Sequence, residues 1–338
     1  NRARKLLNRE VLQREFMREK GARFLFAELW WLSERGMSII DFKILQKEDK
    51  PLLDCFFRAR YYENSHFNFT NLYMWHEPYK IMWAKEDDVL YMKAEWEGRE
   101  FAMQPFGPEE KMAAAVGRFI DYFKAQGKPV RFSGVERSFA DILENYEGAD
   151  FAVESDRNNF DYVYLADDLM KLAGRKFHSK KNHLNSFRKN YPEAEYQPIT
   201  DEIVTQCKLT INGWYKQHAQ EAPDDPFIAL ERQAIIEVLN NFEDFQLKGG
   251  AILIGQRVVA FTFGEQLNDA KTLDIRFEKA LEDYAGSYQA LNQLFLRNQG
   301  SDYAWVNREE DMGIEGLRQA KESYKPVKLI EKFNAWMR

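Results

Sequence analysis

The fold of this chain is decided by residues 251–328, AILIGQRVVAFTFGEQLNDAKTLDIRFEKALEDYAGSYQALNQLFLRNQGSDYAWVNREEDMGIEGLRQAKESYKPVK. The pattern is clearest at residues 272–278, where polar and apolar residues alternate with the period of a strand that buries one face. The predicted elements are, in order, strands at 252–254, 258–264 and 272–278, a helix after Gly286, a strand at 303–307, a helix at 314–323 and a final apolar strand.

This order of elements, with a glycine at the start of the first helix and a tyrosine after the second, resembles the core of a GNAT-type acyltransferase. In that fold two strands splay apart around the acyl donor, and a helix receives the donor's pyrophosphate, because free backbone N–H groups and the helix dipole favour an anion. The resemblance implies that Gly286 and Ser287 bind phosphate and that Tyr324 protonates the leaving group. Without it, Tyr324 is simply an aromatic residue at a helix end. The turn lacks the Gly-rich basic sequence of CoA users.

Three segments resemble a more specific family: residues 177–185 (FHSKKNHLN), 277–280 (FEKA) and 307–321 (NREEDMGIEGLRQAK). This bacterial family is named for the C-terminal domain of phosphatidylglycerol lysyltransferase and is related to the Fem-type aminoacyltransferases. The resemblance covers nearly everything from Met37 onward. It implies an α/β (α+β) fold of two tandem GNAT-like acyltransferase domains, with mixed sheets flanked by helices.

We expect three parts in the chain. Residues 1–36 carry nine basic residues against five acidic ones and form a basic amphipathic N-terminal extension, which either lies on a partner or membrane surface or docks on the body. Residues 37–165 are the first GNAT-like domain. Residues 166–338 are the second and carry the active cleft.

Composition agrees with a globular protein, since 338 residues allow about two domains and 45% of them are apolar. No apolar run is long enough to span a membrane and no signal-peptide pattern occurs, so we expect a cytoplasmic protein without a transmembrane segment. Cys55 and Cys207 have no metal-ligand spacing and are interpreted as buried free thiols. We expect no metal.

Basic residues at 175–189 have no acidic counterpart within that segment. They either form a solvated helix face or bind the phosphates of tRNA, a lipid or a nucleotide. The same two interpretations apply to three basic residues near the C-terminus. The candidates for donor or phosphate binding are Lys176, Lys180, Lys181, Arg188, Arg308, Arg318 and Lys321, together with Gly286 and Ser287.

The catalytic candidates lie on one hairpin. If Asn268-Asp269 is a two-residue turn, Glu265 and Asp274 are diagonal neighbours on one face of the sheet, within reach of one substrate. They are candidates for a general base or for amine binding, and Tyr324 completes the catalytic set. The alternative is a polar pair on a half-exposed hairpin.

Asn307, Glu309 and Asp311 follow a strand end, where side chains converge on a cleft in α/β folds. Asp311 is alternatively the N-cap of the next helix. Residues 61–76 are rich in aromatic and amide side chains and either line a recognition pocket or pack as an aromatic core. His66 is interpreted as a surface or satisfied histidine.

Two functions from different classes remain. The first is an acyl- or aminoacyltransferase whose donor is aminoacyl-tRNA or acyl-CoA, with a lipid headgroup or cell-wall precursor as acceptor. An acyl-CoA-dependent N-acetyltransferase is the variant that uses the second donor. The other class is a non-catalytic GNAT-like module that binds an anionic ligand.

Overall fold

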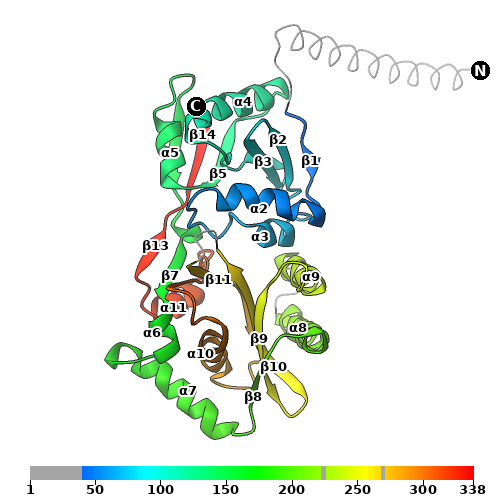
Figure 1. The fold of residues 1–338 in the computed structure, drawn as a ribbon, viewed down its shortest axis with the longest axis vertical. Coiled ribbons are helices and arrows are strands. Elements are labelled where there is room, and N and C mark those ends of the chain that lie inside the picture. Colours follow the sequence, from blue (N-terminus) through cyan, green and yellow to red (C-terminus); the bar gives the residue numbers. More distant parts are fainter. Residues whose placement is uncertain (1–39, 222–225, 268–270) are drawn as a thin grey trace, which may run out of the picture.

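The computed structural model describes residues 40–221, 226–267 and 271–338 (Figure 1). These residues form two seven-stranded mixed sheets flanked by helices, which lie in the upper and lower halves of Figure 1. The predicted α/β class with mixed sheets is therefore confirmed. The expected extension at residues 1–36 lies outside the described residues.

The first sheet combines strands from both ends of the chain. Its order is β1 (Lys43–Ile44), β2 (Met82–Glu86), β3 (Val89–Trp96), β4 (Arg99–Ala102), β5 (Arg131–Val135), β14 (Phe333–Met337) and β6 (Phe151–Ser155). The second sheet runs β8 (Glu195–Pro198), β9 (Lys248–Ile254), β10 (Arg257–Gln266), β11 (Thr272–Ala280), β12 (Trp305–Asn307), β7 (Asp161–Leu165) and β13 (Lys328–Ile330).

The two sheets repeat one plan. In each, three antiparallel strands lead through a helix to a parallel neighbour, β4 to β5 in the first sheet and β11 to β12 in the second. Beyond that neighbour lies an antiparallel strand from the other half, which is β14 in the first sheet and β7 in the second. Each half thus gives its last strand to the other sheet, and Figure 1 shows β14, in red, among the strands of the upper half.

The strand exchange departs from the expected division at residue 165. Residues Asp161–Leu165 pair with the second sheet, whereas Phe333–Met337 pair with the first. Residues 137–165 were not assigned to elements from the sequence, and they contain α5 (Arg137–Glu144), β6 and β7.

Helices cover the faces of both sheets. They are α2 (Lys50–Arg58), α3 (Phe69–Met74), α4 (Met112–Ala125), α5, α6 (Ala166–Lys171), α7 (His178–Asn190), α8 (Asp201–Glu221), α9 (Pro226–Asn240), α10 (Ser287–Gln299) and α11 (Glu315–Glu322). One apolar core lies between the first sheet and α4 and α5, and another between the second sheet and α6, α7 and α10. A third core joins the halves, because side chains of β3 and β10 pack together with α3, α8 and α9.

The hairpin register differs from the expectation. Glu265 is directly opposite Asp274, whereas a two-residue turn at 268–269 would place it opposite Thr272. The Leu267 N–H donates to the Thr272 carbonyl oxygen at 2.8 Å, so the ladder is offset by two residues and the two carboxylates are closer neighbours than predicted. The expected turn, Asn268-Asp269, lies outside the described residues.

The parallel strands part early in both sheets. Strand β12 pairs with β11 only from Thr272 to Asp274, and β11 continues to Ala280. Strand β4 pairs with β5 only at Ala102 and Phe132. In both sheets the diverging strands leave room for side chains to line a pocket.

Candidate active site

Two pockets lie where the parallel strands part. The first-sheet pocket has a volume of about 510 Å³ and is lined by residues of β3, β4, β5 and β14 together with residues from loops. The second-sheet pocket has a volume of about 920 Å³ and is lined by residues of β11, by the start of α10 and by α11. The pockets share His66, Asn71, Trp75, Glu310 and Met312. They therefore meet at one junction between the two halves.

Cations gather at one end of the second-sheet pocket. The Lys180 Nζ lies 4.3 Å from the centre of the Tyr324 ring, and the Arg308 guanidinium lies 4.8 Å from it. Lys321 lines the same pocket and donates from its Nζ to the carbonyl oxygens of Arg308 and Glu309. Two of the predicted phosphate-binding residues therefore lie against the ring of the predicted catalytic tyrosine, and a third lines the same pocket.

Arg308 uses one of its two terminal nitrogens in a hydrogen bond. Its Nη2 donates to Glu278 Oε2 at 2.6 Å, but its Nη1 is buried without a hydrogen-bond partner. Burial lowers the pKa of Lys180, and the positive charge of the nearby Arg308 lowers it further. An anion that binds at this end of the pocket therefore offsets the repulsion between the two cations. Burial raises the pKa of Tyr324 to about 12, which keeps its hydroxyl protonated near neutral pH.

A chain of charged groups runs from the pocket into the sheet. Arg276 contacts the carboxylates of Glu309 and Asp274, and its Nη2 lies 3.9 Å from Glu265 Oε1. Burial raises the pKa of Glu309 well above the usual range, although the Arg276 charge opposes this shift. Burial likewise raises the pKa of Asp274 to about 7, also against the opposing charge of Arg276.

The predicted catalytic pair does not reach either pocket. Asp274 is fully buried and Glu265 is 7% exposed, and neither side chain lines a described pocket. Both lie behind Arg276, which does line the second-sheet pocket. Their geometry suits residues that position this guanidinium.

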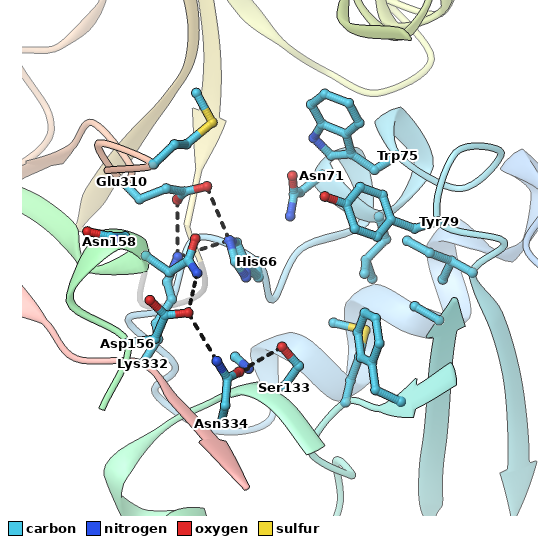
Figure 2. A pocket seen from close by; sticks show the side chains of 18 residues that line it. His66, Asn71, Trp75, Tyr79, Ser133, Asp156, Asn158, Glu310, Lys332 and Asn334 are labelled. Carbon is cyan, nitrogen blue, oxygen red and sulfur yellow. Dashed lines mark hydrogen bonds and ion pairs between the residues drawn. The ribbon is translucent and has the colours of Figure 1, made fainter. Parts of the chain in front are cut away.

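Figure 2 shows the junction from the side of the first-sheet pocket. The buried Lys332 Nζ lies 2.7 Å from Asp161 Oδ1, 3.2 Å from Glu310 Oε2 and 3.0 Å from His66 Nε2. The same His66 Nε2 lies 3.5 Å from Glu310 Oε1, so this nitrogen stands between an ammonium and a carboxylate. Although burial acts in the opposite direction, Lys332 and then His66 hold the pKa of Glu310 well below its usual range.

The loop after β12 directs two successive carboxylates to different partners. Glu309 has a left-handed backbone, φ 56°, and its N–H donates to Asn307 Oδ1 at 2.8 Å. Its side chain turns to Arg276, whereas Glu310 reaches Lys332 and His66. A residue other than glycine is strained in the left-handed conformation. The surrounding contacts must therefore hold the loop so that the two side chains keep their separate partners.

Asp311 fixes the same loop through hydrogen bonds to residues around it. Its carboxylate accepts from Arg318, Arg157, the Tyr162 hydroxyl and the N–H of Gly313. Burial by itself would raise the pKa of Asp311, but these hydrogen bonds hold that pKa well below its usual range. The N-cap of α11 is Ile314, so the alternative role of Asp311 as N-cap is wrong. Of the predicted cleft residues, only Glu309 lines a pocket, because Asn307 and Asp311 are fully buried.

Several other predicted phosphate-binding residues lie outside both pockets. Lys176 pairs with Asp168, and Lys181 is exposed on α7. Arg188 donates to Gln293, and Arg318 is bound to Asp311 and Asn158. These side chains serve ion pairs, hydrogen bonds or the solvated face that was the alternative interpretation.

The predicted phosphate-binding turn at Gly286 and Ser287 packs against helix α7. Gly286 is left-handed, φ 88°, and a Cβ there would come within 2.7 Å of the His183 carbonyl oxygen on α7. The N–H of Ser287 donates to the Tyr284 carbonyl at 3.1 Å, and its side chain is buried. Neither residue lines a described pocket, although Tyr288 and Gln289 in the next turn do.

Sequence reasoning missed the groups at the junction. Asp161, Arg276, Glu310 and Lys332 belong to separate segments, and no spacing in the chain brings them together. One signal was available, because the aromatic and amide-rich segment at 61–76 does line both pockets through His66, Asn71 and Trp75. The interpretation of that segment as a recognition pocket is consistent with this placement.

The described residues contain neither a metal-ion cluster nor a membrane-spanning helix. Within residues 40–221, 226–267 and 271–338, no group of three or more His, Cys, Asp or Glu side chains is arranged to hold a metal ion. In the same described parts, no helix combines the length and apolar character needed to cross a bilayer. Cys207 is buried as expected, whereas Cys55 is exposed, which contradicts that part of the expectation.

The paired sheets, with pockets where parallel strands diverge, form a tandem GNAT-like fold. The family model "Phosphatidylglycerol lysyltransferase, C-terminal" matches residues 58–336, and the chain belongs to this family.

Solved structures agree with this assignment. A conserved protein of unknown function from Bacteroides thetaiotaomicron is 33% identical, with a TM-score of 0.82 over 88% of this chain and all of that one. L-PGS from Bacillus licheniformis shares the fold, with 14% identity and a TM-score of 0.60 over 87% of this chain and 93% of that one. The C-terminal domain of a lysylphosphatidylglycerol synthetase from Agrobacterium fabrum, described as putative, has 13% identity and a TM-score of 0.60 over 86% and 91% of the two chains.

A relative known from its sequence matches about half of this chain. An uncharacterized protein of Mycoplasmoides gallisepticum is 30% identical over 173 residues, which is 51% of this chain. The match spans about half, 54%, of that protein.

Proposed function

We propose that this protein transfers an aminoacyl group from an activated ester, such as aminoacyl-tRNA, to an amine or hydroxyl acceptor on a lipid headgroup or cell-wall precursor. The observation that carries the proposal is the meeting of two pockets at His66 and Glu310, in a member of this family. A transfer reaction needs two substrates to meet at one point, and the junction offers that geometry.

The donor enters the second-sheet pocket. Lys180 and Arg308 supply positive charge beside Tyr324, and Lys321 lines the same pocket. Phosphates near the acyl end of a tRNA match this cluster by charge. The exposed cations of α7 can add long-range attraction to such a polyanion.

Glu309 is the proposed general base. It lines the second-sheet pocket beside the junction, and burial raises its pKa above that of an ordinary carboxyl group, which makes its ionised form a stronger base. Arg276 fixes its carboxylate, and Asp274 and Glu265 position Arg276 from behind. The predicted roles of Asp274 and Glu265 thereby change from catalysis to positioning.

The chemistry balances within these groups. The acceptor nitrogen or oxygen attacks the carbonyl carbon of the ester, and the bond between that carbon and the ribose oxygen breaks. Glu309 receives the proton of the nucleophile, and the Tyr324 hydroxyl gives a proton to the departing oxygen. Exchange with solvent then restores both residues.

An aminoacyl ester fits better than acyl-CoA. Gly286 and Ser287 would receive a CoA pyrophosphate, but that turn is packed against α7 and the Ser287 N–H is already hydrogen-bonded. The cations that remain accessible surround Tyr324 instead. We also retain the two-domain division as a proposal, with the exchanged strands β7 and β14 assigned to the sheets in which they pair.

A transfer assay tests the proposal. Bulk tRNA charged with labelled amino acids is incubated with the protein, lipid vesicles and soluble cell-wall precursors, and labelled acetyl-CoA is tested in parallel. We expect label from tRNA in an acceptor fraction, a loss of about 100-fold in Tyr324→Phe, and no change in Lys124→Gln, an exposed substitution on α4.

Two outcomes would contradict the proposal. Transfer from acetyl-CoA alone would identify an N-acetyltransferase. Absence of turnover with both donors, together with retained binding of an anionic ligand, would identify a non-catalytic binding module.

A further inference from the structure

The first-sheet pocket differs in chemistry from its counterpart. Its wall contains the rings of Trp75 and Tyr79, whose centres are 6.1 Å apart at 84° to each other, and the ring of Phe101. The polar part of the lining consists of amides, a serine, a histidine and charged groups. Aromatic faces arranged at an angle to each other are suited to a cation or an apolar group.

The charge of this pocket is negative. Two carboxylates, Asp156 and Glu310, line it, and Lys332 is the one lysine or arginine among the described residues that do so. Lys332 is completely buried and is already ion-paired with Asp161 as well as Glu310. Its charge is therefore neutralised by groups of the protein itself.

Asp156 has no cation of its own. Its Oδ2 accepts from Asn159 at 2.6 Å and from Asn334 at 3.0 Å, and no ion pair to it is found among the described residues. Figure 2 shows this carboxylate and Glu310 on the same wall, across the pocket from Trp75 and Tyr79. A positively charged group between the walls would contact carboxylates on one side and aromatic faces on the other.

We propose that the first-sheet pocket binds an ammonium group and that the acceptor is therefore a primary amine rather than an anionic glycerol phosphodiester. This inference rests on the proposed transfer function and specifies its acceptor. The phosphate of a phosphodiester headgroup would face Asp156 and Glu310, which repel it, whereas an ammonium gains from both walls. The described lining of the other pocket has five lysine or arginine side chains beside five glutamates, so a phosphate there meets cations as well.

The reaction then forms an amide. The bound ammonium loses one proton and attacks the ester carbonyl as a neutral amine, so that an N–C bond forms and the ester C–O bond breaks. The nitrogen gives a second proton to Glu309, and Tyr324 protonates the departing oxygen. In sum, an ammonium and an ester yield an amide, an alcohol and one released proton.

Direct binding tests the pocket without turnover. Isothermal titration compares 1,5-diaminopentane with glycerol 1-phosphate in the wild type, in Asp156→Asn and in Glu147→Gln, an exposed charge-matched control. We expect the diamine to bind, with affinity about tenfold lower in Asp156→Asn and unchanged in Glu147→Gln. Diamine affinity that is equal in all three proteins, or glycerol 1-phosphate that binds the wild type as tightly as the diamine does, would overturn the proposal.

The bond in the transferred product gives a second test. Vesicles of phosphatidylethanolamine, vesicles of phosphatidylglycerol and a soluble lysine peptide are offered separately with labelled aminoacyl-tRNA. Alkali-stable product on the first identifies an aminolipid, and on the peptide a soluble amine. Alkali-labile product on phosphatidylglycerol alone would refute an amine acceptor and leave the transfer function intact. Absence of transfer would refute the function, and the titration would still decide the pocket.

Discussion

Lys332 and Asp161 form an ion pair of 2.7 Å between two completely buried side chains, at the points where the exchanged strands begin. Asp161 is the first residue of β7, and Lys332 immediately precedes β14. The pair therefore links the two crossings at the centre of the molecule. Asp161 also accepts from Ser65 and Asn307, which extends the link to the loops beside the pockets.

Removing one partner of this pair should destabilise the protein strongly. Lys332→Met leaves Asp161 buried and unpaired, and breaking a buried pair in this way costs about 3–5 kcal/mol. Urea unfolding of the wild type and the variant measures the loss. The double variant Asp161→Asn/Lys332→Met should recover part of the stability, because no unpaired charge remains. Equal stability of wild type and Lys332→Met would contradict the importance of this pair.

Replacing the proposed base should affect turnover more than binding. We expect Glu309→Gln to lower kcat by about 100-fold or more, with donor affinity retained, because general bases contribute about 10²–10⁴-fold. Glu243→Gln, an exposed substitution of the same kind, serves as control. A large rise in KM at unchanged kcat would instead assign Glu309 to substrate binding.

The rate should rise with pH on the acid side. Glu309 acts as a base only when it is ionised, and burial raises its pKa above that of an ordinary carboxyl group. The acid limb of a kcat profile should therefore lie above the usual carboxyl range and disappear in Glu309→Gln. A limb at the usual pKa of glutamate would show that another group titrates.

Donor affinity should depend on Lys180 and on salt. Lys180→Gln removes one phosphate contact, so we expect weaker tRNA binding. The slope of log affinity against log salt should also become smaller in magnitude by about one. Lys124→Gln carries the same charge change on an exposed part of α4 and should leave both unchanged. Identical slopes for wild type and Lys180→Gln would exclude this lysine from the phosphate site.

Asp274 should make the protein less stable as pH rises. Its pKa is about 7 in the folded protein against 3.8 for an ordinary aspartate, so the folded state holds the proton more tightly than the unfolded state. Stability is greatest below the unfolded pKa and falls between the two values, by up to about 1.4 kcal/mol per pH unit. Unfolding free energies of the wild type and Asp274→Asn, measured from pH 4 to pH 8, should diverge over this window. Parallel curves would contradict it.

Much of the fold could be predicted because its signals are local. Alternation at residues 272–278 predicted β11, and the glycine break at Gly286 predicted the start of α10. The family resemblance named Tyr324, and local charge named Lys180, Arg308 and Lys321. That these residues line one pocket could not be predicted, since Lys180 is far from the others in the chain.

The rest could not be predicted because it depends on long-range pairing. Strand β7 reads as the end of the first half, and only its partners β12 and β13 place it in the second sheet. The pairing of Leu267 with Thr272 set the neighbour of Glu265 without leaving a periodic signal. Burial decided the remaining cases, because Asp274 and Asp311 look like surface carboxylates in the sequence and are fully enclosed.

The exchanged strands have a consequence for biosynthesis. Strand β14 is needed between β5 and β6, yet it is made only when translation has reached residue 337. Until then the nascent first half has an open slot with unpaired backbone groups on both sides, which invites wrong pairing between neighbouring nascent chains. Ribosome-bound chains ending at residue 300 should accordingly be captured by chaperones that bind exposed strand edges, and release should follow synthesis of the last strand.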